Sequence, residues 1–489
     1  MKPEIRSSRL DEFIANPRRA LWVLAAPMMG GMAVHTLYML VDTAFIGSLG
    51  KEALAAVTFV GPLFFVLIAL FNGLGTTITA LVAQAVGRKD HAEADRVASS
   101  AIGVSLVLGG MFVVVGLLWG RLMLRGLGAQ GIVLEHAWAY FQVVALSVPL
   151  FFVSATLRSV LAGEGNATTP MYIFGAATVI NLALDALFIF GFGWGVRGAA
   201  LATAGAQVFS LTVFAWVLLV RRSSLVRFRL SGLGYHRPLV KGLITIGVPT
   251  AAGQVIMAAG MAANNRVLAQ FGESTVAGYG AATRVDMFVA MPIFGLAGGA
   301  VAVIGMFAGA GRGDLVRSTA LYTYRWVITL AVVVGGLAFL SSEHVIRIFI
   351  RDPEAVAVGR TYLTFMLAMY PLMAFGATSG RLLQGLGHGV PALVISLVRV
   401  LIIGVPIAYV AVYVFGAPVE AVWASMLVGG ICSNVISLVW VRQLLWKRDP
   451  TARAMVSAGP SPNPGDAPDH DAAPAIPGAT PGPPGVASR

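Results

Sequence analysis

The chain of 489 residues is strongly apolar: 57% of its residues are hydrophobic, 11% are charged, and its mean hydropathy is +0.81. A soluble domain carries about a quarter charged residues, so this composition excludes most soluble folds, including Rossmann and P-loop domains. The formal charge is +12, from 34 Lys and Arg against 22 Asp and Glu, and the distribution of these charges decides what they mean.

Apolar runs long enough to cross a bilayer recur along almost the whole chain. They predict an all-α polytopic membrane protein with twelve transmembrane helices. The first segment is too polar and acidic for a cleavable signal peptide, so we expect it to remain on the protein. The expected spans are residues 20–47, 52–83, 97–120, 136–157, 168–190, 197–220, 240–267, 274–308, 317–340, 360–380, 391–415 and 419–443.

Basic residues are distributed unevenly between the two sets of loops. The N-terminal segment, the loops after even-numbered spans and the C-terminal flank hold 22 Lys and Arg, whereas the opposite loops and their flanks hold eight. By the positive-inside rule, both termini are cytoplasmic. Topology therefore explains the basic excess, and we expect no nucleic-acid partner. The single cysteine, Cys432, excludes disulfides within the chain and cysteine-based metal clusters.

The two halves of the chain resemble each other at a spacing of about 222 residues. Pro27 in LAAPMMG matches Pro249 in IGVPTAA, and GSLGKEALAA matches AQFGESTVAG. VAQAVGRKD likewise matches MFAGAGRGD, and LAGEGN matches LQGLGH. These matches indicate a six-helix unit duplicated in parallel, which is typical of alternating-access carriers with a substrate site between the halves.

This repeat predicts two pseudo-symmetric six-helix lobes between polar segments. The last 39 residues are rich in Pro, Ala, Gly and Asp and cannot bury a core, so we expect them to be disordered. The expected parts are a cytoplasmic segment 1–19, an N-terminal lobe 20–220, a basic cytoplasmic linker 221–239, a C-terminal lobe 240–446 and a disordered cytoplasmic tail 447–489.

Ionisable residues inside spans are costly, so they are functional candidates. The first half holds Asp42 and Asp185, and the topology places both in the outer part of their spans. Asn181 precedes Asp185 by four residues and shares its helix face. Tyr140 and Thr203 fall at a similar depth in two other spans. Five polar side chains from four helices in one layer are what a proton or cation site requires.

Each of these residues also has a structural interpretation. Asp42 could simply end a span, Asn181 and Thr203 could bridge helices, and Tyr140 could anchor at the membrane interface. The comparison of the halves favours function for the carboxylates. At the 222-residue spacing, Asp42 corresponds to Asn264 and Asp185 to Ile407, so only the first half carries the pair.

Two further features have open interpretations. In the second half, Asp286 lies two residues from Arg284, and we interpret them as a secondary ion pair with a structural or gating role. Pro27 lies fifteen residues before Asp42, in a run with Gly30 and Gly31. A proline inside a helix frees a carbonyl and kinks the helix, so Pro27 is either a static packing kink or a hinge.

Several motifs accompany the paired repeat: DTAFIG after Pro27, GRKDHAEADR after the second span, and GEGNATTP followed by NLALDALFIFGFGWGVRGAALATAGAQ. On these motifs, from residue 17 to 446, the sequence resembles the multidrug and toxic compound extrusion (MATE) family, most closely its DinF-like branch. It implies that Asp42 and Asp185 take the coupling ion, with Tyr140, Asn181 and Thr203 around them. A NorM-like branch uses an acidic residue in the seventh span, where this chain has Val255, Ile256 and Met257.

The expected function is secondary active efflux rather than enzymatic catalysis. The protein would export amphipathic cationic drugs in exchange for H⁺ or Na⁺, as a monomer in the bacterial inner membrane. No cofactor is expected, and the only expected metal is Na⁺ at Asp42 and Asp185. One alternative is a lipid-linked oligosaccharide flippase of the same superfamily. A membrane-embedded enzyme is the other, but the seven histidines are scattered and no HExxH or DxD motif occurs.

Overall fold

The computed structural model describes residues 4–221, 224–228 and 232–446. The expected tail 447–489 and parts of the expected linker therefore lie outside the described residues. Within them, twelve helices are long and apolar enough to cross a membrane, which confirms the all-helical fold class. The twelve expected spans coincide with these helices, several of which extend beyond the expected ends by a few residues.

The first half of the chain begins with a short helix that precedes the first span. This helix, α1, falls in the segment expected only to be cytoplasmic. The helices of the first half are α1 Glu4–Ala15, α2 Pro17–Ser48, α3 Lys51–Gly87, α4 His91–Gly126, α5 Gly131–Gly163, α6 Thr168–Asp185 with the π-helical η1 Ala186–Gly191, and α7 Gly195–Ala215 with η2 Trp216–Val220.

The second half repeats this order and adds the short helix α12 before its fourth span, the tenth of the chain. Its helices are α8 Arg237–Gly242, η4 Leu243–Gly247, α9 Val248–Leu268, η5 Ala269–Phe271, α10 Glu273–Gly309, α11 Gly313–Leu340, α12 Ser342–Phe349, α13 Pro353–Gly385, α14 Val390–Leu397, η6 Val398–Gly404, α15 Val405–Tyr413, α16 Glu420–Val441 and η7 Arg442–Trp446.

The internal repeat is visible in the helix boundaries. The helices α3 and α10 begin at residues 51 and 273, and they end at 87 and 309. Both follow a glycine with positive φ, Gly50 at 110° and Gly272 at 99°, a conformation that suits glycine because it lacks a Cβ. Similarly, α5 and α13 begin at 131 and 353 and end at 163 and 385. The duplication therefore extends to the turns between helices.

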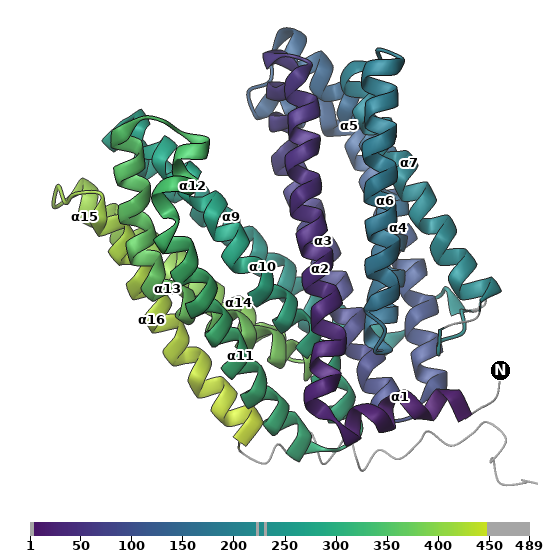
Figure 1. Cartoon of the computed structure of the whole chain (residues 1–489). Helices are drawn as coiled ribbons and strands as arrows, with labels where there is room; N and C mark the ends of the chain where they lie inside the picture. The colour runs from purple at the N-terminus through teal and green to yellow at the C-terminus, as the bar shows by residue number, and fades with distance from the viewer. Residues whose placement is uncertain (1–3, 222–223, 229–231, 447–489) are drawn as a thin grey trace, which may run out of the picture.

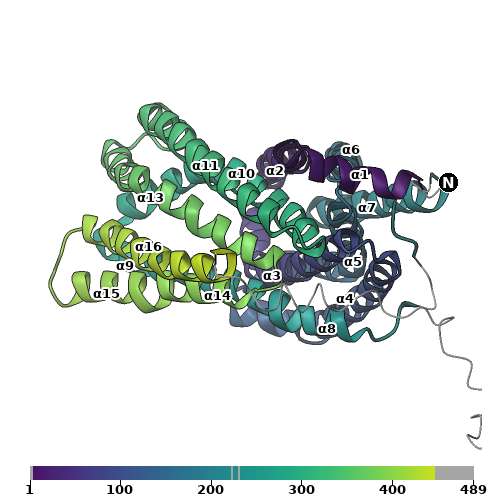
Figure 2. The same ribbon diagram turned by 90° about the horizontal axis from the view of Figure 1, so that it is seen from below.

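The helices form two groups, α2–α7 and α9–α16, which meet at one end of the molecule and diverge at the other (Figure 1). Seen along the helices, the groups lie side by side (Figure 2). We call the end near Glu4 and Trp446 the terminal side. There α10 of the second group packs against α2 and α3 of the first. A core cluster that includes Leu24, Phe307 and Leu383 joins the two groups.

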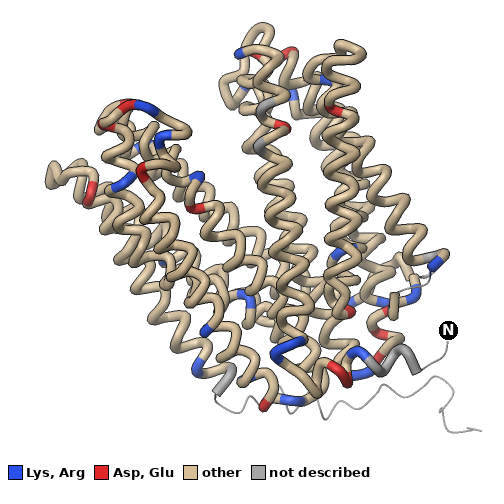
Figure 3. Tube along the Cα trace, in the orientation of Figure 1, with Lys and Arg blue, Asp and Glu red and all other residues tan. Residues whose placement is uncertain are grey.

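The charged residues gather toward the two ends of the helices, and the middle of the helices carries few of them (Figure 3). A hydrocarbon interior favours this distribution, because an unpaired charge there costs several kcal/mol. The helical backbone also satisfies its own hydrogen bonds, as a lipid environment requires. The few ionisable groups that lie well inside the spans are therefore the residues to examine for function.

Candidate functional site

The five polar residues expected to form an ion site lie at the same end of the first group. Asp42 is in the last two turns of α2, and Asp185 is the last residue of α6, so both are far from the terminal side. Thr203 and Tyr140 lie in the third turns of α7 and α5, which begin at that far end. The side chains of Asp185, Asn181 and Tyr140 are buried, with 0%, 3% and 7% of their surface exposed, and Asp42 and Thr203 are half-buried.

Asp185 and Asn181 carry buried polar atoms that lack partners. Neither carboxylate oxygen of Asp185 and neither amide atom of Asn181 has a hydrogen-bond partner among the described residues. Each unsatisfied buried group costs about 1–3 kcal/mol, so an uncompensated set of four is unfavourable. A bound cation or proton would satisfy the three oxygens of this set, whereas the Asn181 amide nitrogen is a donor and needs an acceptor. The π-helical turn η1 begins directly after Asp185, and such turns are frequent at functional sites.

The two carboxylates of the site interact with each other. Asp42 acts electrostatically on Asp185, and both carboxylates act on the Tyr140 side chain. Two carboxylates with an amide and hydroxyl oxygens suit a proton or a hard monovalent cation such as Na⁺. Among the residues that the structure describes, no three His, Cys, Asp or Glu side chains converge as a metal site would require.

Tyr38 belongs to the same cluster, although the sequence analysis did not select it. It lies four residues before Asp42 on α2, and its hydroxyl forms a hydrogen bond with the Thr203 side chain of α7. The carboxylates Asp42 and Asp185 both act on it electrostatically. The i, i+4 spacing to Asp42 places both side chains on one helix face and was the signal in the sequence. Tyr38 therefore connects α2 and α7 beside the two carboxylates.

Asp286 in the second group has partners other than the expected one. The hydroxyl of Tyr362 donates to Asp286 Oδ2 at 2.5 Å, and the hydroxyl of Tyr370 donates to Oδ1 at 2.6 Å. The guanidinium carbon of Arg284 lies 5.0 Å from the centre of the Phe349 ring instead. The ion pair expected between Arg284 and Asp286 is therefore wrong within the described structure, because two residues of separation direct the side chains to different neighbours on the helix.

Pro27 lies inside an uninterrupted α2. Its ring nitrogen cannot donate, so the carbonyl four residues earlier has no intrahelical partner. Neighbouring Gly30 faces the Met171 sulfur of α6, which leaves no room for a larger side chain without movement of that methionine. Pro27 thus lies between the terminal-side end of α2 and the half that carries Asp42.

Glu164, in the loop between α5 and α6, is also a buried carboxyl group, like Asp185. The sequence analysis did not select it. Its Oε1 accepts hydrogen bonds from the Ser224 hydroxyl and, at 3.0 Å, the Val226 amide, and its Oε2 accepts from the Leu225 amide, also at 3.0 Å. Burial raises the pKa of Glu164 to about 7, although these hydrogen bonds act in the opposite direction. Glu164 thereby attaches this loop to the segment joining the two groups. The corresponding residue in the second half is Leu386.

Comparisons with known proteins agree on one family. The MatE family model matches residues 27–187 and 249–410, one match in each repeat. The probable multidrug resistance protein NorM of Thermotoga maritima is 25% identical over 445 residues, which cover 89% of this chain and 95% of that protein.

Two solved structures resemble this one over most of their length. A MOP superfamily transporter from Pyrococcus furiosus, for which reverse polarity of the binding pocket suggested a different function, has a TM-score of 0.83 at 29% identity, covering 88% of this chain and 96% of that chain. An outward-facing multidrug resistance MATE family transporter has a TM-score of 0.82 at 28% identity, with coverage of 90% and 96%.

Proposed function

The chain belongs to the MatE family of multidrug efflux transporters, and on this premise we propose that it exports amphipathic cationic compounds in exchange for H⁺ or Na⁺. The coupling ion binds among Asp42, Asp185, Asn181, Thr203 and Tyr140. The observation that carries this assignment is the set of four partnerless buried atoms on Asp185 and Asn181, next to a second carboxylate.

The proposed orientation follows from the basic loops. With the basic side in the cytoplasm, the terminal side is cytoplasmic and the two groups diverge toward the outside. Asp42 and Asp185 then lie near the external end of their helices, where an ion can enter. A multi-pass protein in this orientation would reside in the bacterial cell membrane with both termini inside.

Ion binding changes the forces between α2 and α6. Without an ion, the negative charges of Asp42 and Asp185 repel each other across the two helices; a bound proton or Na⁺ removes that repulsion. The ends of α2 and α6 can then approach, and Pro27 provides the point at which α2 bends. Closing this end would displace a drug held in the first group.

The electrochemical gradient of the coupling ion supplies the driving force. Each net elementary charge that moves inward through 100 mV releases about 2.3 kcal/mol, a factor of about fifty in concentration since 1.4 kcal/mol is tenfold. Exchange of one monovalent cationic drug for one ion moves no net charge, so the concentration gradient of the ion drives it, and the potential contributes only when more ion charge enters than drug charge leaves. Protons and sodium ions could both use these oxygens. The proposed protein acts as a monomer, since each chain carries a complete ion site and both lobes.

The test is efflux of ethidium or norfloxacin from a host that lacks its own exporters. Wild type, Asp42→Asn and Asp185→Asn are compared at equal membrane expression, with a protonophore or without sodium. Glu420→Gln, an exposed carboxylate at the start of α16, is the control. We expect loss of efflux in both Asp variants only, and the ion dependence separates H⁺ from Na⁺.

Wild-type efflux by both Asp variants would contradict the assignment and make Asp286 the leading carboxylate. If wild type exports none of the dyes, the lipid-linked oligosaccharide flippase becomes the stronger candidate.

A further inference from the structure

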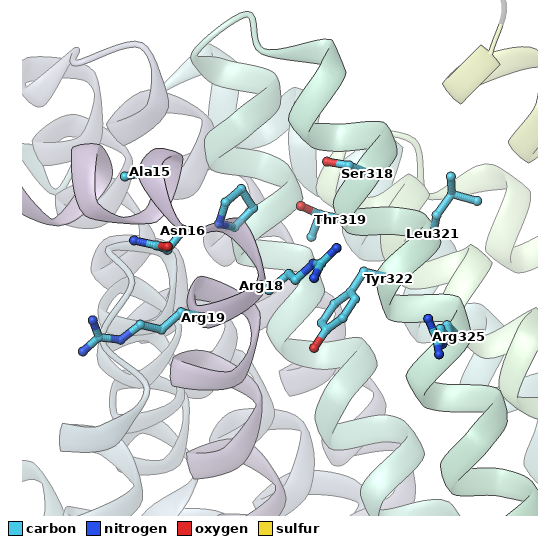
Figure 4. Close-up of a pocket in the computed structure, with 10 residues that line it drawn as sticks. Ala15, Asn16, Arg18, Arg19, Ser318, Thr319, Leu321, Tyr322 and Arg325 are labelled. Atoms are coloured by element: carbon cyan, nitrogen blue, oxygen red, sulfur yellow. The ribbon is translucent and has the colours of Figure 1, made fainter.

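A cavity of about 700 Å³ opens on the terminal side, separate from the ion site. One wall is formed by residues 15–19, where α1 ends and α2 begins (Figure 4). The other wall is formed by residues of α11, namely Ser318, Thr319, Leu321, Tyr322 and Arg325. Its walls therefore belong to different lobes. Neither the fold nor the proposed ion coupling accounts for this cavity.

The cavity is lined by three arginines and by no acidic residue. Arg19 forms an ion pair with Glu12 at 3.3 Å and points away from the α11 wall in Figure 4. Arg18 reaches toward α11, and its guanidinium carbon lies 5.5 Å from the centre of the Tyr322 ring. Arg325 is exposed on α11. Within the described part of the chain, Arg18 and Arg325 form no ion pair with a carboxylate, so both cations are available to an anion.

Neutral groups in the same cavity also lack partners. The Thr319 side chain is 2% exposed, and its hydroxyl has no hydrogen-bond partner within the described structure. Asn16 is the N-cap of α2, yet its side chain makes no capping hydrogen bond. Pro17 has no N–H and the Asn16 N–H donates to the Glu12 carbonyl, so the N–H groups of Arg18 and Arg19 are the ones in the first turn that have no intrahelical acceptor. The helix dipole adds a partial positive charge. Together these groups suit an anion with several acceptor oxygens.

Aromatic residues beside the cavity place it at the level of the lipid headgroups. The Trp22 indole donates to the Tyr322 hydroxyl at 3.1 Å, and the Trp22 and Trp326 rings meet edge to face at 5.5 Å. Tryptophan and tyrosine concentrate at the membrane–water interface, and exposed arginines near helix ends extend toward the phosphates there. A binding site for a soluble ion would not need to lie at the membrane surface, whereas a binding site for a lipid headgroup would.

We propose that this cavity binds the phosphate of an anionic phospholipid headgroup, held by Arg18 and Arg325. Basic pockets between transmembrane helices on the cytoplasmic side are suited to such headgroups. Because the two arginines belong to α2 and α11, the bound lipid links the two lobes where they meet. Given the proposed transport cycle, anionic lipid stabilises the conformation that is closed on the terminal side.

The test measures lipid binding without any transport. The purified full chain in detergent is titrated with phosphatidylglycerol, phosphatidylcholine or inorganic phosphate, and the thermal unfolding midpoint is followed. The double variant Arg18→Gln/Arg325→Gln is compared with Arg237→Gln/Lys241→Gln, which removes the same charge from exposed positions around α8 on the terminal side.

We expect phosphatidylglycerol to raise the midpoint by several degrees in wild type and in the control, and by less than half as much in the cavity variant. Phosphatidylcholine should give a smaller shift in every protein. If both double variants lose the phosphatidylglycerol-induced shift of the midpoint to the same extent, the shift depends on general surface charge, and the proposal is overturned. A shift with inorganic phosphate equal to that with phosphatidylglycerol would assign the cavity to soluble phosphates instead.

A second measurement tests the proposal even if the double variant Arg18→Gln/Arg325→Gln fails to fold. Native mass spectrometry counts the phosphatidylglycerol molecules retained by wild type, Arg18→Lys and Arg325→Lys, which keep the charge but lose the planar two-pronged donor. We expect each single variant to retain fewer lipids than wild type. Undiminished retention in both would contradict a site built on these two arginines. None of these results depends on whether the protein exports drugs.

Discussion

At the scale of single residues, the buried carboxyl groups differ in how they are satisfied. Asp286 accepts from two tyrosine hydroxyls and Glu164 from three donors, so both are held by the protein itself. The oxygens of Asp185 have no such donors. The proposal that Asp185, and not Asp286 or Glu164, exchanges an ion rests on this difference.

The tyrosines around Asp286 provide a prediction about stability. Tyr370→Phe removes one donor from the carboxylate, and a hydrogen bond to a charged group is worth about 1.5–3 kcal/mol. We expect a lower thermal unfolding midpoint in detergent than for Tyr413→Phe, the control at an exposed tyrosine of α15. Equal midpoints for the two variants would show that Asp286 does not depend on Tyr370.

Glu164 predicts a pH dependence of stability. Its pKa rises from 4.5 to about 7 in the folded protein, so between these values the folded state binds more protons than the unfolded state. Its contribution to the free energy of unfolding is therefore largest below pH 4.5, decreases as the pH rises to about 7, and is constant above. We expect the unfolding midpoint of Glu164→Gln to vary less over this range than that of wild type. Identical pH profiles would contradict the assignment.

At the scale of elements, the proposed hinge rests on three features of α2. Its terminal-side half is anchored in the core that joins the two lobes, through Leu21 and Leu24. Its far half carries Tyr38 and Asp42. Pro27 separates these halves at a position without a full set of backbone hydrogen bonds.

Substitution of this proline tests the hinge. Pro27→Ala restores an N–H donor and with it the backbone hydrogen bond that opposes bending, so we expect reduced efflux at unchanged membrane expression. Pro62→Ala in α3, another proline inside a helix, is the matched control and should export as wild type does. If Pro27→Ala exports normally, the kink is static packing.

At the scale of the whole molecule, the two lobes meet along a nearly symmetric contact between α3 and α10. A Cβ added to Gly87 would overlap the carbonyl oxygen of Met306, and one added to Gly309 would overlap that of Gln84. Both pairs are related by the 222-residue repeat. The glycines therefore allow the two backbones to approach closely, as small residues do in membrane helix packing.

Filling this contact should weaken the association of the lobes. Gly87→Ala or Gly309→Ala forces α3 and α10 apart, and overpacking of this kind typically costs about 1–3 kcal/mol. The thermal unfolding midpoint measures the effect. Gly110→Ala in α4, where a Cβ meets nothing within 4 Å, is the control and should be neutral or stabilising. A loss of stability in all three variants would assign the effect to helix glycines in general.

The sequence by itself determined the twelve spans, the duplication and the confinement of the carboxylate pair Asp42 and Asp185 to the first half. Hydropathy, charge and spacing are local properties of the chain, so they can be read without a structure. The helix boundaries nevertheless correct one sequence match. Matching VAQAVGRKD to MFAGAGRGD aligns Gly87 with Gly311. In the structure Gly87 is the last residue of α3 and Gly309 is the last residue of α10, so Gly309 is the true counterpart of Gly87.

Only the tertiary structure decided which side chains meet. Tyr362 and Tyr370 replace Arg284 as partners of Asp286, Glu164 reaches the segment that joins the lobes, and Arg18 approaches α11. Each contact joins residues far apart in the chain, and its formation depends on how helices cross and rotate. That geometry arises from the packing of many side chains at once, so no single segment of the sequence contains it.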